Sequence, residues 1–198
     1  MNAERCPVVI LAAGASMRLG RPKQLLQFQQ QSLIRRLVSE AQNSTATVVV
    51  VTGSNHHQLV AELQEQPIVV VENQDWAQGM GSSISTGMGK LKSLVPDATA
   101  VILAVCDQPF VNAALFTALV DLQESSGKKI VACSYANTVG TPVLFDQKYF
   151  EALQQLKALE GAKKVVQQFA EDVALLSFPQ GAIDIDTHDD YEALLQQT

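Results

Sequence analysis

Three cations follow the first strongly apolar run of the chain, and they are the first residues that could do chemistry. The segment "VVILAAGASMRLGRPKQLL" brings Arg18, Arg21 and Lys23 close together in sequence. Arginine binds phosphate oxygens through its planar fork, and lysine acts as a compact point charge. Two glycines of the same loop, Gly14 and Gly20, allow the backbone to approach a ligand closely. The segment therefore predicts a site for a polyphosphate group.

The glycine spacing of this loop differs from that of the commoner phosphate-binding loops. A Walker A motif requires Gly-Lys-Ser/Thr in succession, and a dinucleotide fingerprint requires G-x-G-x-x-G. Here the order is Gly14, Gly20 and then Lys23. Taken alone, the loop is equally compatible with an ordinary turn after a strand whose cations are solvated.

Carboxylates later in the chain favour the ligand interpretation. Asp107 ends the apolar run "AVILAVCD", while Asp184 and Asp186 alternate in "AIDIDTHDDY" and therefore share one face of an extended segment. Mg²⁺ prefers oxygen ligands and binds to one or two carboxylates together with substrate phosphates. A capping Asp107 and a solvated acidic turn are the alternatives. Considered with the basic loop, the pattern favours a metal site at Asp107 and Asp186, with Asp184 in reserve because register decides which side chain faces the site.

The elements that must position these residues are short, continuously apolar strands separated by helical segments. Such continuity indicates strands buried on both faces, hence an α/β, single-domain, Rossmann-like fold with a mainly parallel sheet and helices on both faces. In such sheets, ligands bind beyond the carboxyl ends of the strands. Two segments of the C-terminal half, "TPVLF" and "VALLSF", are expected to be antiparallel edge strands. Ser32, Asn112 and Thr187 are expected to cap helices.

Composition limits the function classes. A chain of 198 residues suits one domain, and its net charge of −6 excludes a global basic field for nucleic acid. No run approaches the roughly 18 apolar residues of a membrane span, and "MNAERCPVV" has no signal-peptide core. The three scattered cysteines favour reduced thiols. We expect a cytoplasmic protein with neither a nucleic-acid nor a membrane partner.

The segment "NQDWAQGMGSSISTG" carries a second candidate anion site. Ser82 and Ser83 stand at the start of an expected helix, where N–H groups and the helix dipole favour an anion. Gly81 frees the backbone beside them, and Asn73 and Trp76 precede them. An N-cap serine is the plainer alternative.

Together these segments resemble a known family. "LAAGASMRLGRPKQLL" is similar to the signature LAAGxSxRxGxPKxLL of the MobA-like nucleotidyltransferases, and "CDQP" and "DIDTHDDY" resemble their two metal-binding segments. "NQDWAQGMGSSISTG" resembles a block of the MocA branch, the molybdenum cofactor cytidylyltransferases. The likeness runs in order over nearly the whole chain.

The resemblance implies a role for each matching residue. Arg18, Lys23 and Asp107 would be catalytic, and Asp107 and Asp186 would bind Mg²⁺. The nucleotide-binding set would be Leu11, Ala12, Ala13, Gly14, Arg18 and Lys23. The acceptor-binding set would be Asn73, Gly81, Ser82 and Ser83. Residues 1–198 would form one nucleotidyltransferase domain, with a nucleotide-binding half of about 1–110 and an acceptor-binding half of about 111–198.

The implied reaction is transfer of CMP from CTP to the terminal phosphate of molybdenum-molybdopterin, with release of pyrophosphate. Members that use GTP typically have LAGG, so Ala13 favours CTP over GTP. The implied partners are a nucleoside triphosphate, a phosphorylated pterin-type acceptor, and a molybdoenzyme or its maturation factor. The alternatives are a related transferase that uses GTP or another phosphorylated acceptor, and a non-catalytic cofactor carrier. The complete Arg18, Lys23 and Asp107 set argues against carriage.

Two departures from the family pattern lie in the expected acceptor half. Thr141 stands where the family often has the histidine of G-H-P, and "EGAKK" is a shortened form of a GDxGA element. The identity of the acceptor is therefore less well supported than that of the nucleotide.

Overall fold

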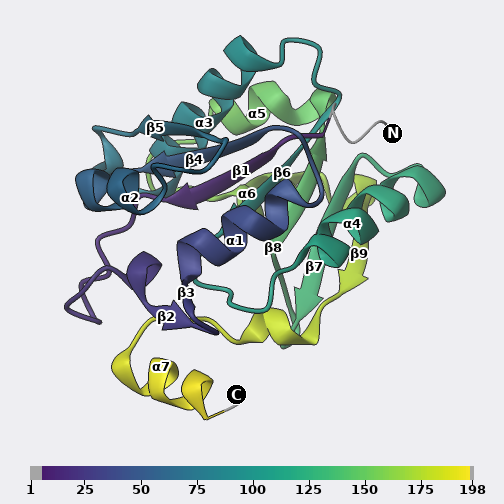
Figure 1. The fold of residues 1–198 in the computed structure, drawn as a ribbon. Coiled ribbons are helices and arrows are strands. Elements are labelled where there is room, and N and C mark those ends of the chain that lie inside the picture. Colours follow the sequence, from purple (N-terminus) through teal and green to yellow (C-terminus); the bar gives the residue numbers. More distant parts are fainter. Residues whose placement is uncertain (1–5, 197–198) are drawn as a thin grey trace.

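The structure, a computed structural model, describes residues 6–196 and contains a seven-stranded sheet (Figure 1). The order across the sheet is β5-β4-β1-β6-β8-β7-β9. Register pairs β1 with β4 and β6, β4 with β5, and β7 with β9 in parallel, whereas β8 is antiparallel to both its neighbours. The strands are β1 (Val8–Ala12), β4 (Val48–Thr52), β5 (Val69–Glu72), β6 (Ala100–Val105), β7 (Ile130–Tyr135), β8 (Thr138–Asp146) and β9 (Val173–Ser177).

The predicted fold class is confirmed, but the structure corrects the placement of the antiparallel strand. β8 lies inside the sheet, between β6 and β7, and β9 forms the edge and runs parallel to β7. The reason is a tight turn between β7 and β8, where Ala136 and Asn137 have positive φ angles. This turn folds β8 back against β7, and the buried Val143–Phe145 stretch then pairs with β6.

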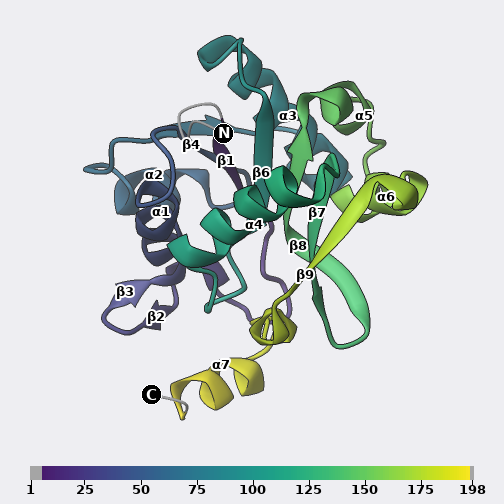
Figure 2. The same cartoon turned by 90° about the vertical axis from the view of Figure 1, so that its right-hand side faces the viewer.

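Helices cover both faces of the sheet, which explains why the interior strands β1 and β6 are apolar along their whole length (Figure 2). Val8 and Ile10 join the core beneath one helical layer, while Val9 and Leu11 join the core beneath the other. The first layer comprises α1 (Leu33–Gln42), α2 (His56–Glu62) and α4 (Ala113–Ser126). The second comprises α3 (Met80–Leu94), α5 (Phe150–Gln154) and α6 (Ala162–Gln168).

The expected helix caps are present. Ser32 and Asn112 each accept a hydrogen bond from a backbone N–H in the first turn of α1 and α4. Thr187 begins α7 (His188–Leu195) with a capping box to Asp190. Short 3₁₀ turns occupy Lys23–Leu25 (η2), Trp76–Gln78 (η3), Gln147–Tyr149 (η4), Ala170–Asp172 (η5) and Pro179–Ala182 (η6).

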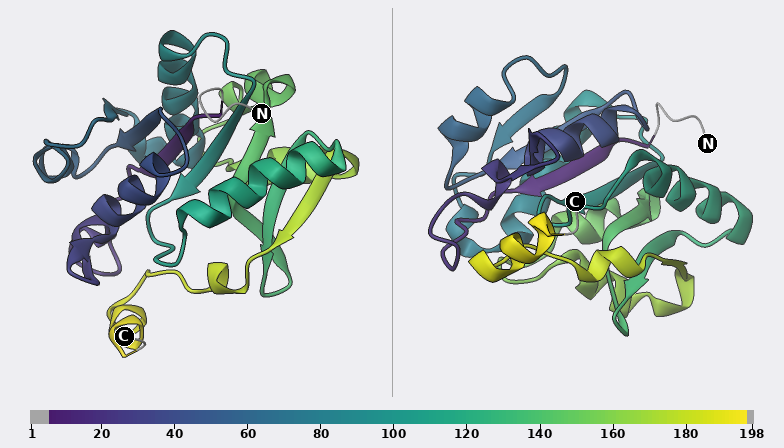
Figure 3. Two further views of the ribbon diagram at one scale, coloured as in Figure 1. Left: turned by 45° about the vertical axis from the view of Figure 1, so that its right-hand side comes forward. Right: turned by 60° about the horizontal axis from the view of Figure 1, so that its bottom comes forward.

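A small third core joins the C-terminal segment to the loop after β1. Ile185 and Leu194 pack with Phe28 of the hairpin formed by β2 (Gln27–Phe28) and β3 (Gln31–Ser32). The Tyr191 hydroxyl donates to the carbonyl oxygen of Gln27 at 2.8 Å. Figure 3 shows α7 beside this N-terminal region, at the end of the molecule where β1 ends. Packing thus brings the C-terminal segment to the loop and hairpin that follow β1, at the carboxyl end of that strand.

No helix within residues 6–196 is both long and apolar enough to cross a membrane. The expected absence of a signal-peptide core rests on residues 1–9, and the first five of these lie outside the described part of the chain.

Candidate active site

The loop after β1 is organised by a glutamine that the sequence analysis did not single out. Gln24 is buried, and its amide donates to the carbonyl oxygens of Ala12 at 3.0 Å and Gly14 at 2.9 Å. The hydroxyl of Ser16 accepts from the Lys23 backbone N–H at 3.1 Å. Gly20 has a φ of 69°, which favours glycine. A polar Gln24 directly before two leucines is only a weak signal in the sequence, since many such glutamines are solvated.

One ammonium group joins the two carboxylates that were predicted to bind metal. Lys23 Nζ lies 2.6 Å from Asp107 Oδ2 and 2.9 Å from Asp186 Oδ1. Arg18 contributes a guanidinium nitrogen 3.0 Å from Asp186 Oδ2. The structure therefore brings the predicted catalytic residues Arg18, Lys23 and Asp107 together with the predicted metal ligand Asp186, and these residues come from three distant parts of the chain.

The backbone explains why Asp186 reaches this point. The Ile185 N–H donates to the carbonyl oxygen of Asp107 at 3.0 Å, which ties the C-terminal segment to the end of β6. The Ile185 side chain is fully buried, and Asp186 N donates to Asp190 Oδ2 at 3.1 Å. With Ile185 anchored, Asp186 meets the basic loop, whereas Asp184 lines a cavity on the other side of Asp107.

The charges at the site shift the pKa values of several groups. Burial alone would lower the pKa of Lys23, but the charge of Asp107 and the hydrogen bonds to both carboxylates outweigh it, so the pKa lies above its ordinary value. The hydrogen bond from Lys23 lowers the pKa of Asp186. Burial, together with the charges of Asp107 and Asp186, raises the pKa of Asp184. Cations therefore favour the ionised form of Asp186, whereas the charges that act on Asp184 are those of other carboxylates.

The donor set fits a divalent cation that is completed by substrate oxygens. Within the described chain no group of three or more His, Cys, Asp and Glu residues is arranged to hold a metal ion. Asp107 and Asp186 nevertheless converge on one cation, the Lys23 ammonium. Two carboxylates with phosphate and water oxygens satisfy Mg²⁺, which rarely uses an all-protein cage.

A cavity of about 240 Å³ adjoins Lys23 and Asp107. It contains five of the predicted nucleotide-binding residues, namely Leu11, Ala12, Ala13, Gly14 and Lys23. Trp76 and Ser83 also line it. Arg18 does not line this cavity. It contacts Asp186 at the edge of the site, and its side chain is 74% exposed.

The start of α3 is held by hydrogen bonds to Asn73, which precedes the helix, and to Ala158, which comes much later in the chain. The buried Asn73 amide donates to Ser82 Oγ at 2.8 Å and to Ser83 Oγ at 3.0 Å. The Gly81 N–H donates to the Ala158 carbonyl at 2.9 Å, and any side chain at Gly81 would meet the backbone of Lys157. Of the four residues predicted to bind the acceptor, Ser83 lines the cavity described above, and the other three build and anchor the helix start.

Cys106 lies next to Asp107 without contributing a nucleophile. Its side chain is buried, and burial raises the pKa of the thiol to about 12. The thiol is therefore protonated near neutral pH.

The chain matches the MobA-like NTP transferase domain over residues 8–173. It belongs to this family. The chain is accordingly a MobA-like nucleotidyltransferase, and the resemblance noted in its sequence is confirmed.

Several curated relatives carry different names. Purine catabolism protein PucB of Bacillus subtilis (strain 168) is 28% identical over 195 residues, which cover 93% of each chain. Nicotine blue oxidoreductase of Paenarthrobacter nicotinovorans is 38% identical over 112 residues, covering 51% of this chain and 48% of that protein. The molybdenum cofactor cytidylyltransferase of Escherichia coli (strain K12) is 29% identical over 89 residues, covering 44% and 45%. The chain thus spans about half the length of the last two relatives.

Solved structures include a protein that is similar over its full length. Rv0371c from Mycobacterium tuberculosis H37Rv superimposes with a TM-score of 0.81 at 29% identity, covering 98% of this chain and 100% of that chain. A structure of Rv0371c in complex with manganese gives a TM-score of 0.76 at 27% identity, covering the same shares. The MobA-like fold assigned here is therefore shared with this protein throughout the chain.

Proposed function

We propose that this MobA-like nucleotidyltransferase transfers CMP from CTP to the terminal phosphate of molybdenum-molybdopterin and releases pyrophosphate. The observation that carries the transferase chemistry is the convergence of Lys23, Asp107 and Asp186 beside the nucleotide-side cavity. The choice of acceptor is supported by relatives named molybdenum cofactor cytidylyltransferase and probable molybdenum cofactor guanylyltransferase.

In this proposal the nucleoside occupies the cavity beside Trp76. Leu11, Ala12, Ala13 and Gly14 border the base and ribose, and Arg18 and Lys23 bind the triphosphate. Ala13 is buried in the cavity wall, so its methyl group limits the space for a larger base. The location of Ser83 in this cavity favours the nucleotide as the ligand of the α3 start, although the acceptor phosphate remains the alternative for Asn73, Gly81 and Ser82.

Asp107 and Asp186 would hold Mg²⁺, which when bound neutralises charge on the α-phosphate. An oxygen of the acceptor phosphate forms a bond to the α-phosphorus, and the bond from that phosphorus to the bridging oxygen breaks. The electron pair leaves with pyrophosphate. Arg18 and Lys23 stand beside the same carboxylates and offset the charge that develops on this leaving group.

The chemistry requires no general base from the protein. A phosphate monoester is largely ionised near neutral pH and is already a nucleophile. The protein therefore contributes alignment and charge. The protonated Cys106 thiol beside Asp107 is consistent with this division of labour.

Use of GTP is the specific alternative, because two relatives are named probable molybdenum cofactor guanylyltransferase. There are two further alternatives: the transferase acts on a different phosphorylated acceptor, or the protein carries the cofactor without turnover. We also propose a cytoplasmic location and a molybdoenzyme or its maturation factor as the receiver of the product.

The test is pyrophosphate release with Mg²⁺ and each of CTP, GTP, ATP and UTP, with and without molybdenum-molybdopterin. We expect release with CTP only when the cofactor is present, and none from an Asp107→Asn variant. Release with GTP in place of CTP would overturn the choice of base. Binding of CTP without release would overturn the acceptor assignment and favour another acceptor or carriage.

A further inference from the structure

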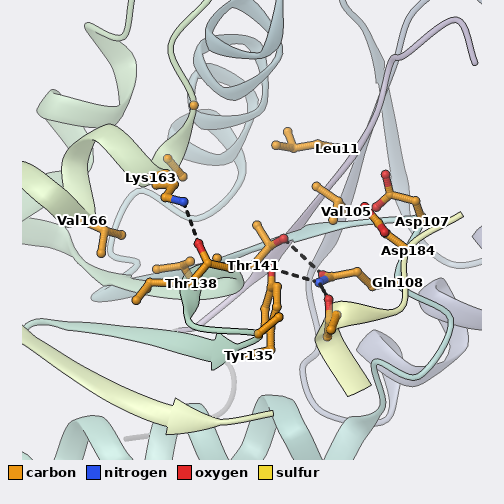
Figure 4. Close-up of a pocket in the computed structure, with 18 of the residues that line it drawn as sticks. Leu11, Val105, Asp107, Gln108, Tyr135, Thr138, Thr141, Lys163, Val166 and Asp184 are labelled. Carbon is orange, nitrogen blue, oxygen red and sulfur yellow. Dashed lines mark hydrogen bonds between the residues drawn. The ribbon is translucent and has the colours of Figure 1, made fainter. Parts of the chain in front are cut away.

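A second cavity, of about 460 Å³, lies on the other side of Asp107 (Figure 4). It is enclosed by the β7–β8 hairpin, α6 and η6. Leu11, Met80, Val105 and Asp107 line both this cavity and the one beside Trp76. The two spaces therefore adjoin at Asp107, so a ligand in the second cavity lies next to the site proposed for phosphoryl chemistry.

The middle of this cavity carries a fixed polar network. The Gln108 amide is buried, with 5% of the residue exposed; it donates to the Tyr135 hydroxyl oxygen at 3.2 Å and to the Gly181 carbonyl at 3.0 Å. The Gln108 carbonyl accepts from the Thr141 hydroxyl at 3.1 Å. The Tyr135 oxygen accepts from Gln108 and is also hydrogen-bonded with Thr141, and the hydroxyl carries its own proton as a donor. Burial raises the pKa of Tyr135, which keeps that proton in place near neutral pH.

The walls around this network are apolar. Val139 and Val143 come from β8, and Val166 comes from α6. Apolar walls with a few fixed polar groups are typical of pockets that bind ring compounds, because the walls cover the ring faces and the polar groups meet the ring edge.

The end remote from Asp107 carries a cation. Lys163 Nζ donates to the Thr138 hydroxyl at 2.7 Å, and no ion pair among the described residues involves Lys163. The next residue, Lys164, is instead paired with Glu160 and does not line the cavity. Figure 4 shows Lys163 on the opposite side of Tyr135 and Thr141 from Asp107 and Asp184. The cavity is therefore bipolar, with carboxylates at one end and a cation at the other.

The resemblance already implies that the acceptor binds in this half of the chain; we propose that, in this second cavity, Lys163 determines acceptor specificity by binding an oxygen at the end remote from the acceptor's phosphate. The chemical class is a flat ring compound with a phosphate at one end and a carbonyl or anionic oxygen at the other. Tyr135 and Thr141 contact the hydrogen-bonding edge of the ring. The inference rests on the proposed function for the identity of the reaction, and it places the acceptor against the β7–β8 hairpin and α6.

The experiment compares Lys163→Ala with Lys164→Ala, a neighbouring charge removal on the same helix. Both variants and the wild-type protein are titrated with molybdenum-molybdopterin and with CTP in the pyrophosphate-release assay, and molybdenum-molybdopterin binding is measured directly by equilibrium dialysis. We expect Lys163→Ala to raise the KM for the acceptor about tenfold, the effect of losing one charge-assisted contact, with the KM for CTP unchanged. Lys164→Ala should behave as wild type. Tyr135→Phe should raise only the acceptor KM, and Lys163→Arg should partly restore acceptor binding.

The outcomes separate this inference from the proposed function. Equal acceptor KM values for Lys163→Ala and Lys164→Ala would overturn the inference while leaving the reaction intact. If molybdenum-molybdopterin binds without pyrophosphate release, the proposed function fails, and selective loss of that binding in Lys163→Ala still supports the cavity assignment. The cavity assignment is overturned if Lys163→Ala binds molybdenum-molybdopterin as tightly as the wild-type protein does, or if the wild-type protein does not bind it.

Discussion

Lys23 and Asp107 lie 84 positions apart in sequence, yet the Lys23 ammonium is 2.6 Å from an Asp107 carboxylate oxygen. The same ammonium also reaches Asp186. In the protein without nucleotide, the cation from the first loop thus compensates the two carboxylates proposed to bind metal. Removal of Lys23 should therefore affect metal binding and catalysis in opposite directions.

Lys23→Ala should lower turnover by about 10²- to 10³-fold, because a charge that offsets the leaving pyrophosphate is lost. The same change leaves Asp107 and Asp186 without their shared cation, so Mn²⁺ should bind more tightly in the absence of nucleotide. Pyrophosphate release measures the first effect, and electron paramagnetic resonance of free Mn²⁺ measures the second. Lys92→Ala, which removes an exposed cation of α3, is the control. Unchanged turnover in Lys23→Ala would contradict its proposed role.

Asp186→Asn should reduce turnover more than Asp184→Asn does. Asp186 shares a cation with Asp107, whereas Asp184 lines the second cavity. We expect a loss of about 10²-fold or more for Asp186→Asn and a smaller loss for Asp184→Asn, measured at saturating Mg²⁺. The reverse order would make Asp184 the metal ligand. Thermal unfolding of both variants checks that the fold is retained.

Trp76 is the single tryptophan of the chain and lines the nucleotide-side cavity, so its fluorescence should report nucleotide binding. CTP with Mg²⁺ should alter the emission at lower concentrations than GTP. Ala13→Gly removes a buried methyl group from the cavity wall, so the preference for CTP should weaken by about 1–3 kcal/mol, the usual scale for a small steric difference. An unchanged preference in this variant would remove Ala13 from the determinants of base choice.

The protein should lose the stabilising contribution of Asp172 in acid. Its carboxylate accepts from the Tyr149 hydroxyl at 2.6 Å and from Lys148 Nζ at 3.0 Å, and these contacts, led by the Tyr149 hydrogen bond, lower its pKa from 3.8 to about 2. Because the folded state favours the ionised form, the contribution to stability is complete above the unfolded pKa of about 4 and is lost as the pH falls towards 2.

Urea unfolding between pH 7 and pH 2 tests this expectation. The difference in the free energy of unfolding between wild type and Asp172→Asn should be largest near pH 7 and should shrink below about pH 4. Glu65→Gln, at an exposed position, serves as the charge-removal control. A difference that stays constant with pH would contradict the lowered pKa.

The local features of this chain could be predicted from sequence because they depend on neighbouring residues. Continuous apolar runs indicated doubly covered strands, and Ser32, Asn112 and Thr187 indicated helix starts, since a cap needs only the backbone of the next turn. The placement of "TPVLF" could not be obtained in this way. A short apolar segment of this kind can form either an edge strand or an interior strand. The choice depends on the turn at Ala136 and Asn137 and on the pairing partners, which only the structure gives.

The sequence by itself determined the family and the residue types of the nucleotide site, because the signature around Lys23 and the segments around Asp107 and Asp186 are each contiguous. Only the tertiary structure decided how these segments meet. The Ile185 N–H on the Asp107 carbonyl fixes which aspartate faces Lys23, and the buried Gln24 amide holds the first loop. The second cavity, with Gln108, Tyr135 and Lys163, also required the structure. Its walls come from separate elements, and their proximity is set by long-range packing that no local pattern encodes.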